Sequence, residues 1–525
     1  MMRAMNCTPT AQVDTVGSDS LIGAWLKQEE SIRPFWPFPS SFQGIQDRLT
    51  HTQGINMERR SLVSDVLERQ YQAAAVPVPE ELKSFRSGAR AVTTGHQLVL
   101  MGGPAFFHYK ILSAIRWAKV LSDQGIAAVP VFWLASEDHD FEEIAQVFSS
   151  GDEAFHWRPK EDPRGKAVGR LVWTQEDENA LAHWANTAGV LPMQVNHSFD
   201  SMPLAQRVRM WVHEMFAEQG VLVIDGDDPE LKKAASHLWN AEWNGGGIAD
   251  SVKESTAALE AAGWKAQLSL QPNNVFHLND AGQRTRSDRW LENNTSTSWE
   301  AVSAKNWSPN AALRPLYQEF LLESAAVIGG PGEVAYWLQL RRAFDHHKIE
   351  LPALMLRDGA LVWSTEQATL AQAVEWSPAR GMWKGADASA SWVSMQMEPD
   401  DEVQEAWSQW GKALEAHANG MGREVVPTTL AALKQMEKEW LRLKKKWRKS
   451  VRARHAERCL DLEHLFDAVL FPHANPQERV VNARGLAGDA ESFKAWNRLW
   501  LQQVEGGIDP QFLIFESLSK LDVGD

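Results

Sequence analysis

The densest group of chemically capable side chains in this 525-residue sequence is Ser136-Glu137-Asp138-His139-Asp140, which directly follows the apolar run Val129–Ala135. Three carboxylates and a histidine at a strand end could orient an amine, accept its proton, or hold Mg²⁺ on a nucleotide. The alternative is a helix N-cap, because Asp and Glu favour the first helical turn. So many carboxylates exceed what a cap needs, and we predict catalytic roles for Asp138, His139 and Asp140 and a binding role for Glu137. A zinc site is disfavoured, since adjacent residues cannot all face one metal, and no metal ligands are predicted.

A histidine stands after a second apolar segment, in Thr93-Thr94-Gly95-His96. The pattern resembles the His-x-Gly-His signature of class I synthetases and nucleotidyl transferases, whose histidines stabilise charge on a triphosphate during adenylate formation. Thr93 replaces the first histidine, so the match is partial, and a glycine turn with an incidental histidine is the alternative. Its place at the first strand-to-helix turn favours function. We predict that His96 is catalytic and stabilises charge on an activated carboxyl group.

A glycine pair occurs twice in the same context. Gly102-Gly103-Pro104 is followed five residues later by Tyr109, and Gly329-Gly330-Pro331 is followed five residues later by Tyr336. Paired glycines let a backbone turn sharply, and the helix N-terminus behind them offers free N–H groups that hold phosphate or carboxylate. The alternative is a tight helix entry without a ligand. Because the loop is repeated, we predict that both glycine pairs and both tyrosines bind substrate or nucleotide.

Further polar candidates follow predicted strands or open predicted helices. Arginine is the preferred clamp for carboxylate and phosphate, although a structural ion pair is the commoner role of any single arginine. The candidates are Asn310, Arg314, Glu333 and Arg357.

The elements that would position these residues follow from the apolar spacing. Ala91–Thr94 predicts a strand, Ala105–Leu121 a helix with Pro104 at its first position, and Val129–Ala135 a buried parallel strand, which together form a βαβ unit. Asp358-Gly359 predicts a hairpin-type turn. Asp228-Pro229-Glu230 predicts a helix start, and Gly332–Phe344 predicts a helix. Further predicted strands are Val221–Ile224, Ala266–Leu270, Val275–Leu278, Ala325–Ile328 and Ala353–Leu356.

Four regions are predicted along the chain. Residues 1–90 are mainly helical, residues 91–366 form the nucleotide-binding core, residues 367–469 form a helical hairpin, and residues 470–525 return to the core. The hairpin is predicted from apolar residues spaced three or four apart on both sides of Asn419–Thr429, which is typical of a coiled coil. Its second helix is basic from Arg442 to Arg454; a solvated face is favoured over an anionic partner.

Composition excludes several classes of protein. Lysine plus arginine number 53 against 68 aspartate plus glutamate, giving a net charge of −15, which disfavours nucleic-acid binding. Apolar runs such as Ala127–Ala135 fall far short of the roughly 20 residues of a membrane span. Two distant cysteines, Cys7 and Cys459, and the absence of a signal pattern in the first twenty residues predict a cytoplasmic protein.

Beyond these single motifs, the sequence is similar to the cysteine ligase family of bacillithiol biosynthesis (BshC). The similarity covers most of the chain, in order. It is carried by Thr94-Gly95-His96-Gln97, Gly103-Pro104, Pro130-Val131-Phe132-Trp133, Glu137-Asp138-His139-Asp140-Phe141, Ser308-Pro309-Asn310, Leu313-Arg314-Pro315-Leu316-Tyr317-Gln318-Glu319, Gly329-Gly330-Pro331, Glu333, Ala335-Tyr336-Trp337, Arg357 and Pro476-Gln477-Glu478-Arg479. On this similarity Thr94, Gly95 and Gln97 join the predicted binding residues.

The resemblance implies an α/β fold with a Rossmann-like parallel-sheet core, inserted connecting segments, a C-terminal α-helical coiled-coil hairpin and a homodimer formed through it. It implies a ligase that joins L-cysteine to glucosaminyl-malate by an amide bond. Such a bond requires carboxyl activation by ATP, which Mg²⁺ could accompany, and no tightly bound cofactor is expected. Two alternatives stay open: a nucleotidyl transferase or other adenylate-forming enzyme with a different substrate, and a non-catalytic nucleotide-binding coiled-coil scaffold, which the carboxylates at Glu137–Asp140 disfavour.

Overall fold

The computed structural model describes residues 5–11, 20–52, 54–149, 154–193, 200–268, 272–292, 294, 302–487, 490–504 and 511–517. The chain divides into two compact units, one of residues 1–363 and 477–525 and the other of residues 364–476. Within the described residues, no helix combines the length and apolar character that crossing a membrane requires.

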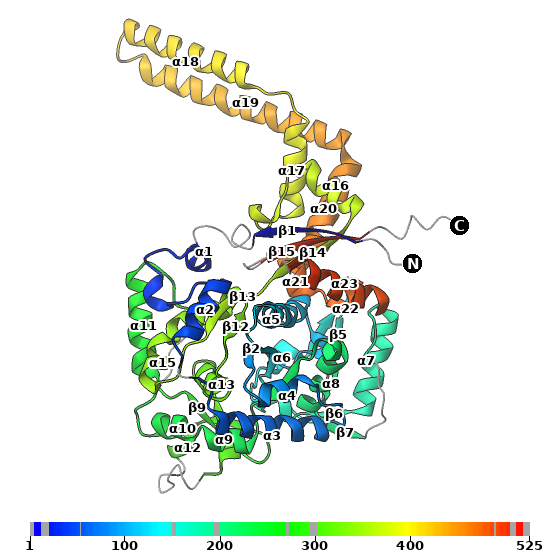
Figure 1. Ribbon diagram of the computed structural model, residues 1–525. Coiled ribbons are helices and arrows are strands. Elements are labelled where there is room, and N and C mark those ends of the chain that lie inside the picture. The colour runs from blue at the N-terminus through cyan, green and yellow to red at the C-terminus, as the bar shows by residue number, and fades with distance from the viewer. Residues whose placement is uncertain are drawn as a thin grey trace, which may run out of the picture. The chain divides into compact units, whose positions relative to one another are not determined.

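A five-stranded sheet forms the centre of the first unit (Figure 1). Its strand order is β13-β12-β2-β3-β8, and every neighbouring pair is parallel. The strands are β2 (Arg90–His96), β3 (Ala128–Leu134), β8 (Leu222–Asp225), β12 (Ala326–Gly329) and β13 (Ala353–Leu356). The chain first moves from β2 to β3 and β8, and later returns to the other side of β2 through β12. The strand order therefore reverses between β2 and β12, and crevices at such switch points bind ligands in open α/β sheets.

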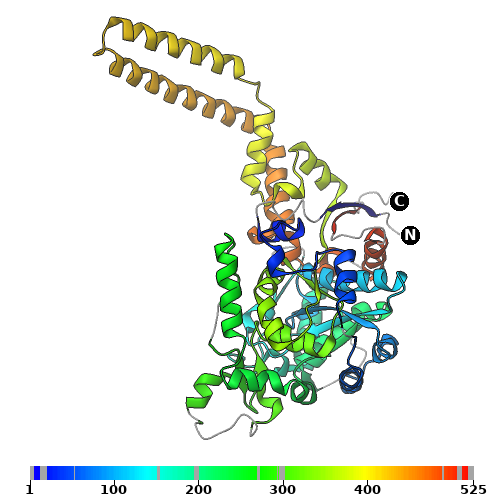
Figure 2. The ribbon, with the colours of Figure 1, turned by 60° about the vertical axis from the view of Figure 1, so that its left-hand side comes forward.

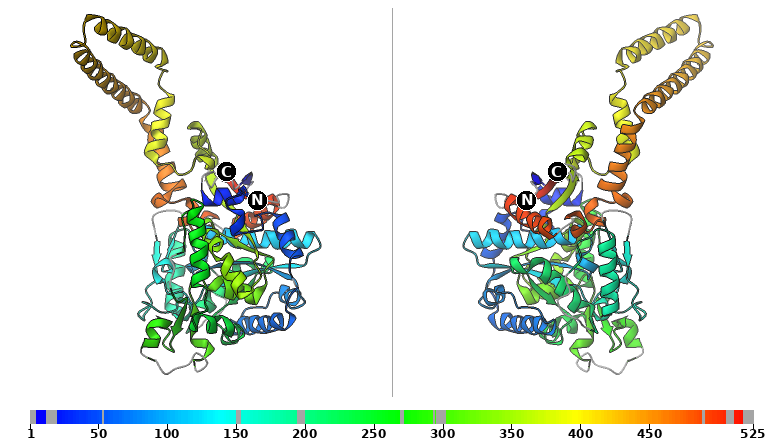
Figure 3. Two further views of the ribbon diagram at one scale, coloured as in Figure 1. Left: turned by 90° about the vertical axis from the view of Figure 1, so that its left-hand side faces the viewer. Right: turned by 90° about the vertical axis from the view of Figure 1, so that its right-hand side faces the viewer.

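Helices bury both faces of the sheet, which explains the continuous apolar strands. Val92, Ile328 and Met355 pack in one cluster with Ala114 and Trp117 of α5 (Ala105–Asp123). Their strand neighbours, including Ala91, Val327 and Leu354, pack in a second cluster, as expected when alternate side chains point to opposite faces. Helices α3 (Met57–Ala73) and α4 (Glu81–Arg86) contribute to this second cluster, where α3 contacts β8 and α4 contacts β3. Figure 3 shows helices on both sides of the sheet.

Two long insertions separate consecutive strands of the sheet. The first, between β3 and β8, contains α6 (Phe141–Ile144), β4 (Gln146–Phe148), β5 (Ala154–His156), β6 (Val172–Thr174), α7 (Gln175–Thr187), β7 (Ser201–Pro203) and α8 (Leu204–Phe216). The second, between β8 and β12, contains α9 (Pro229–Ala234), α10 (Ser236–Trp243), α11 (Ala249–Ala261), β9 (Val275–Leu278), β10 (Arg284–Arg286), α12 (Ser287–Glu292), β11 (Trp307–Pro309) and α13 (Arg314–Leu322). The predicted Rossmann-like core with inserted connecting segments is thereby confirmed.

The ends of the chain meet in a separate small sheet of order β1-β15-β14. In it, β1 (Met5–Ala11) pairs antiparallel with β15 (Gln511–Ser517), and β14 (Gly359–Ser364) completes it. The remaining elements of this unit are α1 (Leu21–Leu26), α2 (Phe42–Thr50), α14 (Pro331–Trp337), α15 (Arg341–His347), α21 (Gln477–Val480), α22 (Ala483–Ala487) and α23 (Ala490–Val504).

Several local predictions are wrong. Asp358-Gly359 is not a hairpin turn, because β13 and β14 belong to different sheets. A 3₁₀ turn at Leu338–Leu340 interrupts the helix predicted over Gly332–Phe344. Residues 266–268 are not a strand, and the other residues of that prediction lie outside the described ones. The mainly helical first 90 residues also contain β1, whose partner β15 is too distant in sequence to be foreseen.

The second unit is helical. It comprises α16 (Thr365–Ala373), α17 (Gly385–Met395), α18 (Asp401–Met421), α19 (Val426–Arg454) and α20 (Ala456–His464). The long helices α18 and α19 run side by side, joined by a short connection, as Figure 2 shows. No residue of α19 is buried, and Trp410 and Trp447, both on the predicted apolar stripes, are 44% and 43% exposed. The predicted helical pair is present, whereas its coiled-coil packing stays a prediction.

Candidate active site at the carboxyl ends of the central strands

A cleft of about 540 Å³ opens beyond the carboxyl ends of β2 and β3. We call it the strand-end cleft. Its residues come from the ends of β2 and β3, the segment after β3, helices α5, α6, α13 and α14, the small sheet β9–β11 and the turn that follows it. Its lining is Gly95, His96, Gln97, Lys110, Trp133, Leu134, Ala135, Glu137, Asp138, His139, Glu143, Phe276, Arg284, Pro309, Asn310, Ala311, Arg314, Glu333 and Tyr336. The cleft lies at the switch point of the sheet, where ligand binding is expected.

The segment after β3 presents its side chains in different directions. Glu137 is buried and lines the cleft, Asp138 is half-buried, and His139 is exposed at the mouth. Asp138 accepts a hydrogen bond of 2.8 Å from Gln97 Nε2 and one of 2.7 Å from the backbone N–H of His139. Burial opposes ionisation, but the His139 side chain, 3.5 Å away, together with Gln97, Arg284 and the backbone N–H of His139, holds the pKa of Asp138 well below its usual range. Asp138 is therefore a fixed anion, whereas Asp140 is exposed and does not line the cleft.

His96 ends β2 and stands between two aromatic rings. Its ring centroid lies 5.2 Å from that of Phe106 and 5.4 Å from that of Phe107. Burial, reinforced by the nearby ammonium of Lys110, lowers the pKa of His96 to about 3, so the imidazole is neutral at physiological pH. Its Nδ1 lies 3.2 Å from the carbonyl oxygen of Gln97, an acceptor, so Nδ1 donates and Nε2 keeps a lone pair. The charge-stabilising role of His96 stays a prediction. A neutral imidazole could fill it only through hydrogen bonds, because the ring carries no positive charge.

A buried ion pair ties the β2 side of the cleft to the β12 side. Lys110 of α5 lies 2.6 Å from Glu333 of α14, with side-chain exposures of 4% and 15%. Lys110 also donates to the carbonyl oxygen of Gly95. Arg314 lies 3.6 Å from Glu333 and donates a hydrogen bond of 2.7 Å to the hydroxyl of Tyr336. Although burial opposes it, Lys110 and Arg314 hold the pKa of Glu333 below its usual range, so this carboxylate stays charged.

Arg284 of β10 closes the opposite wall. Its side chain is 5% exposed and donates to Ser308 Oγ at 3.0 Å, to the carbonyl oxygen of Pro309 and to His139 Nδ1 at 2.9 Å. Its guanidinium also lies 4.1 Å from the ring centroid of Phe276. These contacts hold a cation rigidly above the segment that follows β3. Neither Arg284 nor Lys110 was singled out from the sequence; the available signal for Lys110 was a lysine directly beside apolar residues of a predicted helix.

The structure brings together ten of the residues predicted to act at the site. They are Gly95, His96, Gln97, Glu137, Asp138, His139, Asn310, Arg314, Glu333 and Tyr336. Asn310 holds the turn before α13: its side-chain oxygen accepts from the backbone N–H groups of Ala312 and Leu313, and its amide donates to Asn274. Eight predicted residues do not line the cleft: Thr94, Gly102, Gly103, Tyr109, Asp140, Gly329, Gly330 and Arg357.

The two glycine pairs do not have equivalent surroundings. Gly330 is the N-cap of α14, the helix that carries Glu333 and Tyr336 into the cleft. The corresponding start of α5 is closed, because the first N–H of that helix, at Ala105, donates to the carbonyl oxygen of Val481 at 2.7 Å. Asn482 adds a hydrogen bond of 2.8 Å to the carbonyl oxygen of Gly103. The first glycine pair is thus filled by the C-terminal part of the chain rather than open to an anion.

The remaining predicted residues outside the cleft have structural partners. Tyr109 is buried with its ring centroid 4.7 Å from that of Trp500. The hydroxyl of Thr94 donates to the carbonyl oxygen of Ile328, across the strands β2 and β12. Arg357 donates to Glu478 at 3.0 Å behind the turn at Gly330. Pro104, predicted as the first helical residue, is the N-cap of α5.

The fold and the cleft define a Rossmann-like α/β protein with a candidate active-site crevice at the switch point of its sheet. Residues 5–358 match the family described as "Bacillithiol biosynthesis BshC, N-terminal Rossmann-like domain". The chain belongs to the BshC family, which confirms the family identified from the sequence. It extends beyond the matched domain by the helical unit and the C-terminal segment.

Several similar proteins bear the name "Putative cysteine ligase BshC". The protein of Cytophaga hutchinsonii is 31% identical over 352 residues, which cover 63% of this chain and 65% of that protein. The protein of Flavobacterium johnsoniae is 29% identical over 372 residues, covering 66% and 69%. The protein of Flavobacterium psychrophilum is 32% identical over 341 residues, covering 59% and 62%. The matched part thus spans about two thirds of the length of these relatives.

Proposed function

We propose that this protein joins L-cysteine to glucosaminyl-malate by an amide bond, the last step of bacillithiol assembly, after ATP-dependent activation of the cysteine carboxyl group. The observation that carries the proposal is the strand-end cleft, in which fixed cations and fixed carboxylates face one another at the switch point of the sheet. Family membership names the reaction class. The cleft contributes groups of both signs, as a zwitterionic amino acid and a carboxylate-bearing amine require.

The two sides of the cleft suit different parts of the reaction. On the side of β2 and β12, Arg314 and Lys110 would face the phosphates or the carboxylate of the activated cysteine, near the neutral His96. On the β3 side, Glu137, Asp138 and His139 would orient the amine that attacks. Two groups held on opposite walls of one cleft convert a two-substrate encounter into a positioned reaction.

We also propose that the protein works in the cytoplasm as a homodimer formed through α18 and α19. Apolar side chains remain exposed along both helices, including Trp410 at 44% and Leu443 at 41%. Exposed apolar surface of this kind is typical of helices that pack against a partner. Sedimentation analysis of the whole chain tests this point: a dimer is expected, dissociated by paired charge substitutions such as Trp410→Glu with Leu443→Glu.

The direct test uses the purified whole chain with L-cysteine, glucosaminyl-malate, ATP and Mg²⁺. We expect a product whose mass equals the sum of both substrates less one water, together with either AMP and pyrophosphate or ADP and phosphate. Mass spectrometry detects the amide, and each omitted component serves as a control. A deletion strain should accumulate glucosaminyl-malate. Failure to form the amide, combined with unchanged metabolite levels in the deletion strain, would refute the proposal.

Variants connect this activity to the cleft. His96→Ala and His139→Ala are each expected to lower the thiol level of complemented cells, whereas Glu142→Gln, an exposed substitution outside the cleft lining, is expected to leave it unchanged. Unchanged thiol levels in both histidine variants would refute the claim that the strand-end cleft is the active site. An amide formed from another amino acid in preference to cysteine would instead point to an adenylate-forming enzyme with a different substrate.

A further inference from the structure

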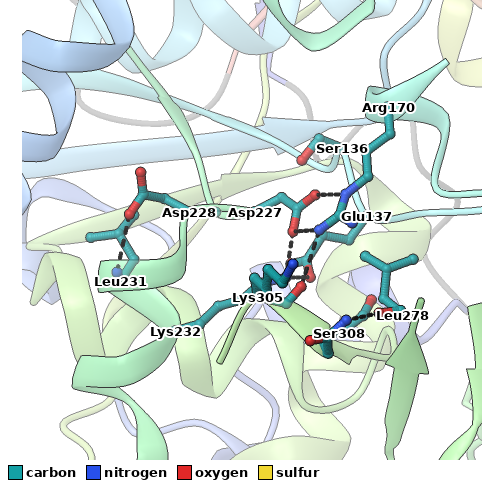
Figure 4. A network of polar contacts seen from close by, with 12 residues as sticks. Ser136, Glu137, Arg170, Asp227, Asp228, Leu231, Lys232, Leu278, Lys305 and Ser308 are labelled. Atoms are coloured by element: carbon teal, nitrogen blue, oxygen red, sulfur yellow. Dashed lines mark hydrogen bonds and ion pairs between the residues drawn. The ribbon is translucent and has the colours of Figure 1, made fainter. Parts of the chain in front are cut away.

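A buried network of charges supports the wall of the cleft that carries Glu137 (Figure 4). Lys232 of α9 lies 2.6 Å from Glu137 Oε1 and also donates to Asp227 Oδ1. Asp227 in turn accepts two hydrogen bonds from Arg170, at 2.7 and 2.9 Å. The side chain of Lys232 is fully buried, and those of Asp227 and Glu137 are 7% and 10% exposed. Lys232 is therefore shared between two carboxylates. Asp227 has a second cationic partner in Arg170, with which Glu137 forms no ion pair.

The pKa values of the two carboxylates are shifted in opposite directions. Asp227 is surrounded by Arg170 and Lys232, which hold its pKa below the usual range although burial opposes them. Burial raises the pKa of Glu137 to about 7, because its share of Lys232 and the smaller effect of Arg284 do not outweigh burial and the nearby negative charge of Asp227. The same two partners keep Lys232 itself protonated, because they raise its pKa against the effect of burial. Glu137 can thus gain or lose a proton near neutral pH while its neighbours keep their charges.

The other carboxylates of the cleft are less suited to carry a proton. Asp138 and Glu333 both have lowered pKa values, because hydrogen bonds to Asp138 and the cations beside Glu333 stabilise their ionised forms. Glu143 has a raised pKa from partial burial and the nearby Asp140, but it is an exposed residue at the rim. A general base works best when its pKa lies near the working pH. Among the carboxylates that line the cleft, Glu137 alone combines such a pKa with a buried position.

The two histidines of the cleft are committed elsewhere. His139 accepts a hydrogen bond from Arg284 on Nδ1, so this nitrogen faces a fixed cation rather than the open cleft. His96 is neutral, with a pKa lowered to about 3 mainly by burial, and binds a proton only in strong acid. The geometry leaves Glu137 facing the cleft with a charged lysine fixed behind it.

We infer that Glu137 is the catalytic residue that accepts the proton of the attacking amine, and that Lys232, held between Glu137 and Asp227, is the positioning residue that tunes it. This inference rests on the proposed amide-forming reaction. In that step the amine nitrogen bonds to the activated carbonyl carbon of cysteine. The C–O bond to the phosphate-containing leaving group breaks, and AMP or phosphate, derived from ATP, departs with the electron pair. The proton lost by the nitrogen passes to the carboxylate of Glu137.

The groups around Glu137 determine how its proton affinity should change. Besides Lys232 and Asp227, Arg284 of β10 faces it and favours the ionised form, whereas the buried Tyr317 of α13 lies near it as a neutral group. Asp225, at the end of β8, has a pKa raised by burial and by Asp227, and it accepts a hydrogen bond from Ser136. Loss of Lys232 removes the main cation and should raise the pKa of Glu137. Loss of the charge on Asp227 releases Lys232 to Glu137 and should lower it.

The first experiment measures the proton affinity of Glu137 without any substrate. Infrared difference spectra of the whole chain between pH 5 and pH 9 are expected to contain a carboxyl band that titrates near pH 7 and is missing in Glu137→Gln. We expect Lys232→Met to move this midpoint up by about one pH unit and Asp227→Asn to move it down by a similar amount. If Lys232→Met does not fold, Asp227→Asn alone still tests whether the charges around Lys232 set the pKa of Glu137. A band that stays in Glu137→Gln, or a midpoint that does not move in Asp227→Asn, overturns the tuning.

The second experiment measures amide formation against pH. The rate should rise as Glu137 loses its proton, with the same midpoint as the infrared titration and the same opposite shifts in the two variants. Glu137→Gln is expected to reduce kcat by about 10²- to 10⁴-fold with a small change in KM. Glu137→Ala should regain part of its rate with added formate, which can enter the vacated space and accept the proton. The exposed Glu142→Gln serves as the control.

The outcomes separate the inference from the proposed function. If the wild-type chain makes no amide while the infrared midpoint behaves as described, the proposed function fails and the catalytic assignment fails with it, whereas the tuned carboxyl is retained. If the wild-type chain makes the amide and Glu137→Gln does so at the same rate, the proposed function is retained and Glu137 is not the proton acceptor. Loss of kcat without formate rescue or a shifted pH profile would make Glu137 a structural residue.

Discussion

The ion pair between Lys110 and Glu333 offers a quantitative test of how the cleft is held together. It links α5 to α14 across the carboxyl ends of β2 and β12 at a distance of 2.6 Å. Removing one partner of a buried pair typically destabilises a protein by about 3–5 kcal/mol, because the other charge is left without compensation. In Lys110→Met, however, Glu333 keeps Arg314 at 3.6 Å. We therefore expect a loss of about 2–3 kcal/mol in the stability of the larger unit.

Calorimetry can detect this change in the transition of the larger unit. With an unfolding entropy of about 2.1 cal/mol/K per residue and roughly 400 residues, each kcal/mol lowers Tm by about 1 °C, so Lys110→Met should lower Tm by about 3 °C. Lys119→Met is the matched control, since Lys119 lies on the same helix in an exposed pair with Asp123 and should change Tm by less than about 1 °C. Glu333→Gln completes a double-mutant cycle.

The cycle and its pH dependence distinguish an ion pair from packing. The double variant should lose about 2 °C less than the sum of the single variants, because neither charge is then left alone. The pKa of Glu333 is lowered by folding, so its contribution is present above its unfolded pKa of about 4.3 and is lost as the pH falls. The difference between wild type and Lys110→Met should therefore narrow below about pH 4.5. Additive losses that persist unchanged into acid would refute the ion-pair argument.

Three further predictions concern the cleft and its surroundings. Gly103→Ala should destabilise the chain strongly, since its φ is +53° and an added Cβ would lie 2.5 Å from Val99 Cγ2, whereas Gly330→Ala should fold normally; thermal shifts compare the two. Arg284→Met should raise KM or lower kcat at least 10-fold in steady-state kinetics of amide formation, because the wall of the cleft loses its hydrogen bonds. The control is Arg286→Met, which lies two residues along β10, pairs with Asp288 and should change neither constant. Asn482→Ala should lower Tm by a few degrees without changing KM, because it removes buried bonds at the closed glycine turn.

The part of the fold that could be predicted is the part determined by local pattern. Continuous apolar runs and the glycine turn between them identify β2, α5 and β3, and the apolar spacing identifies α18 and α19. Strand order could not be predicted, because it depends on contacts between residues far apart in sequence. For the same reason the pairing of β1 with β15 and the separation of β13 from β14 were missed.

The glycine pairs show why a repeated motif can mislead. Both pairs precede a helix and a tyrosine, so the sequence alone gives them the same role. The structure distinguishes them through Val481 and Asn482, which fill the first turn from the C-terminal part of the chain. Nothing local to Gly102-Gly103 announces these partners. Likewise, Arg284 reaches the cleft only because β10 pairs with β9, so its position depends on an insertion and not on a motif.

The charges of the cleft also change the kind of ligand that it suits. A pure anion site would contain an excess of cations, as the glycine loops suggested. The lining instead combines three cations with four carboxylates, namely Lys110, Arg284 and Arg314 with Glu137, Asp138, Glu143 and Glu333. Most of them are held in pairs that compensate one another, so a ligand with a single charge would itself lack a full counter-charge, which is costly in a confined site. A zwitterionic amino acid can satisfy both kinds, because its ammonium can face a carboxylate and its carboxylate can face a cation. This balance, more than the glycine turns, supports an amino acid as one of the two substrates.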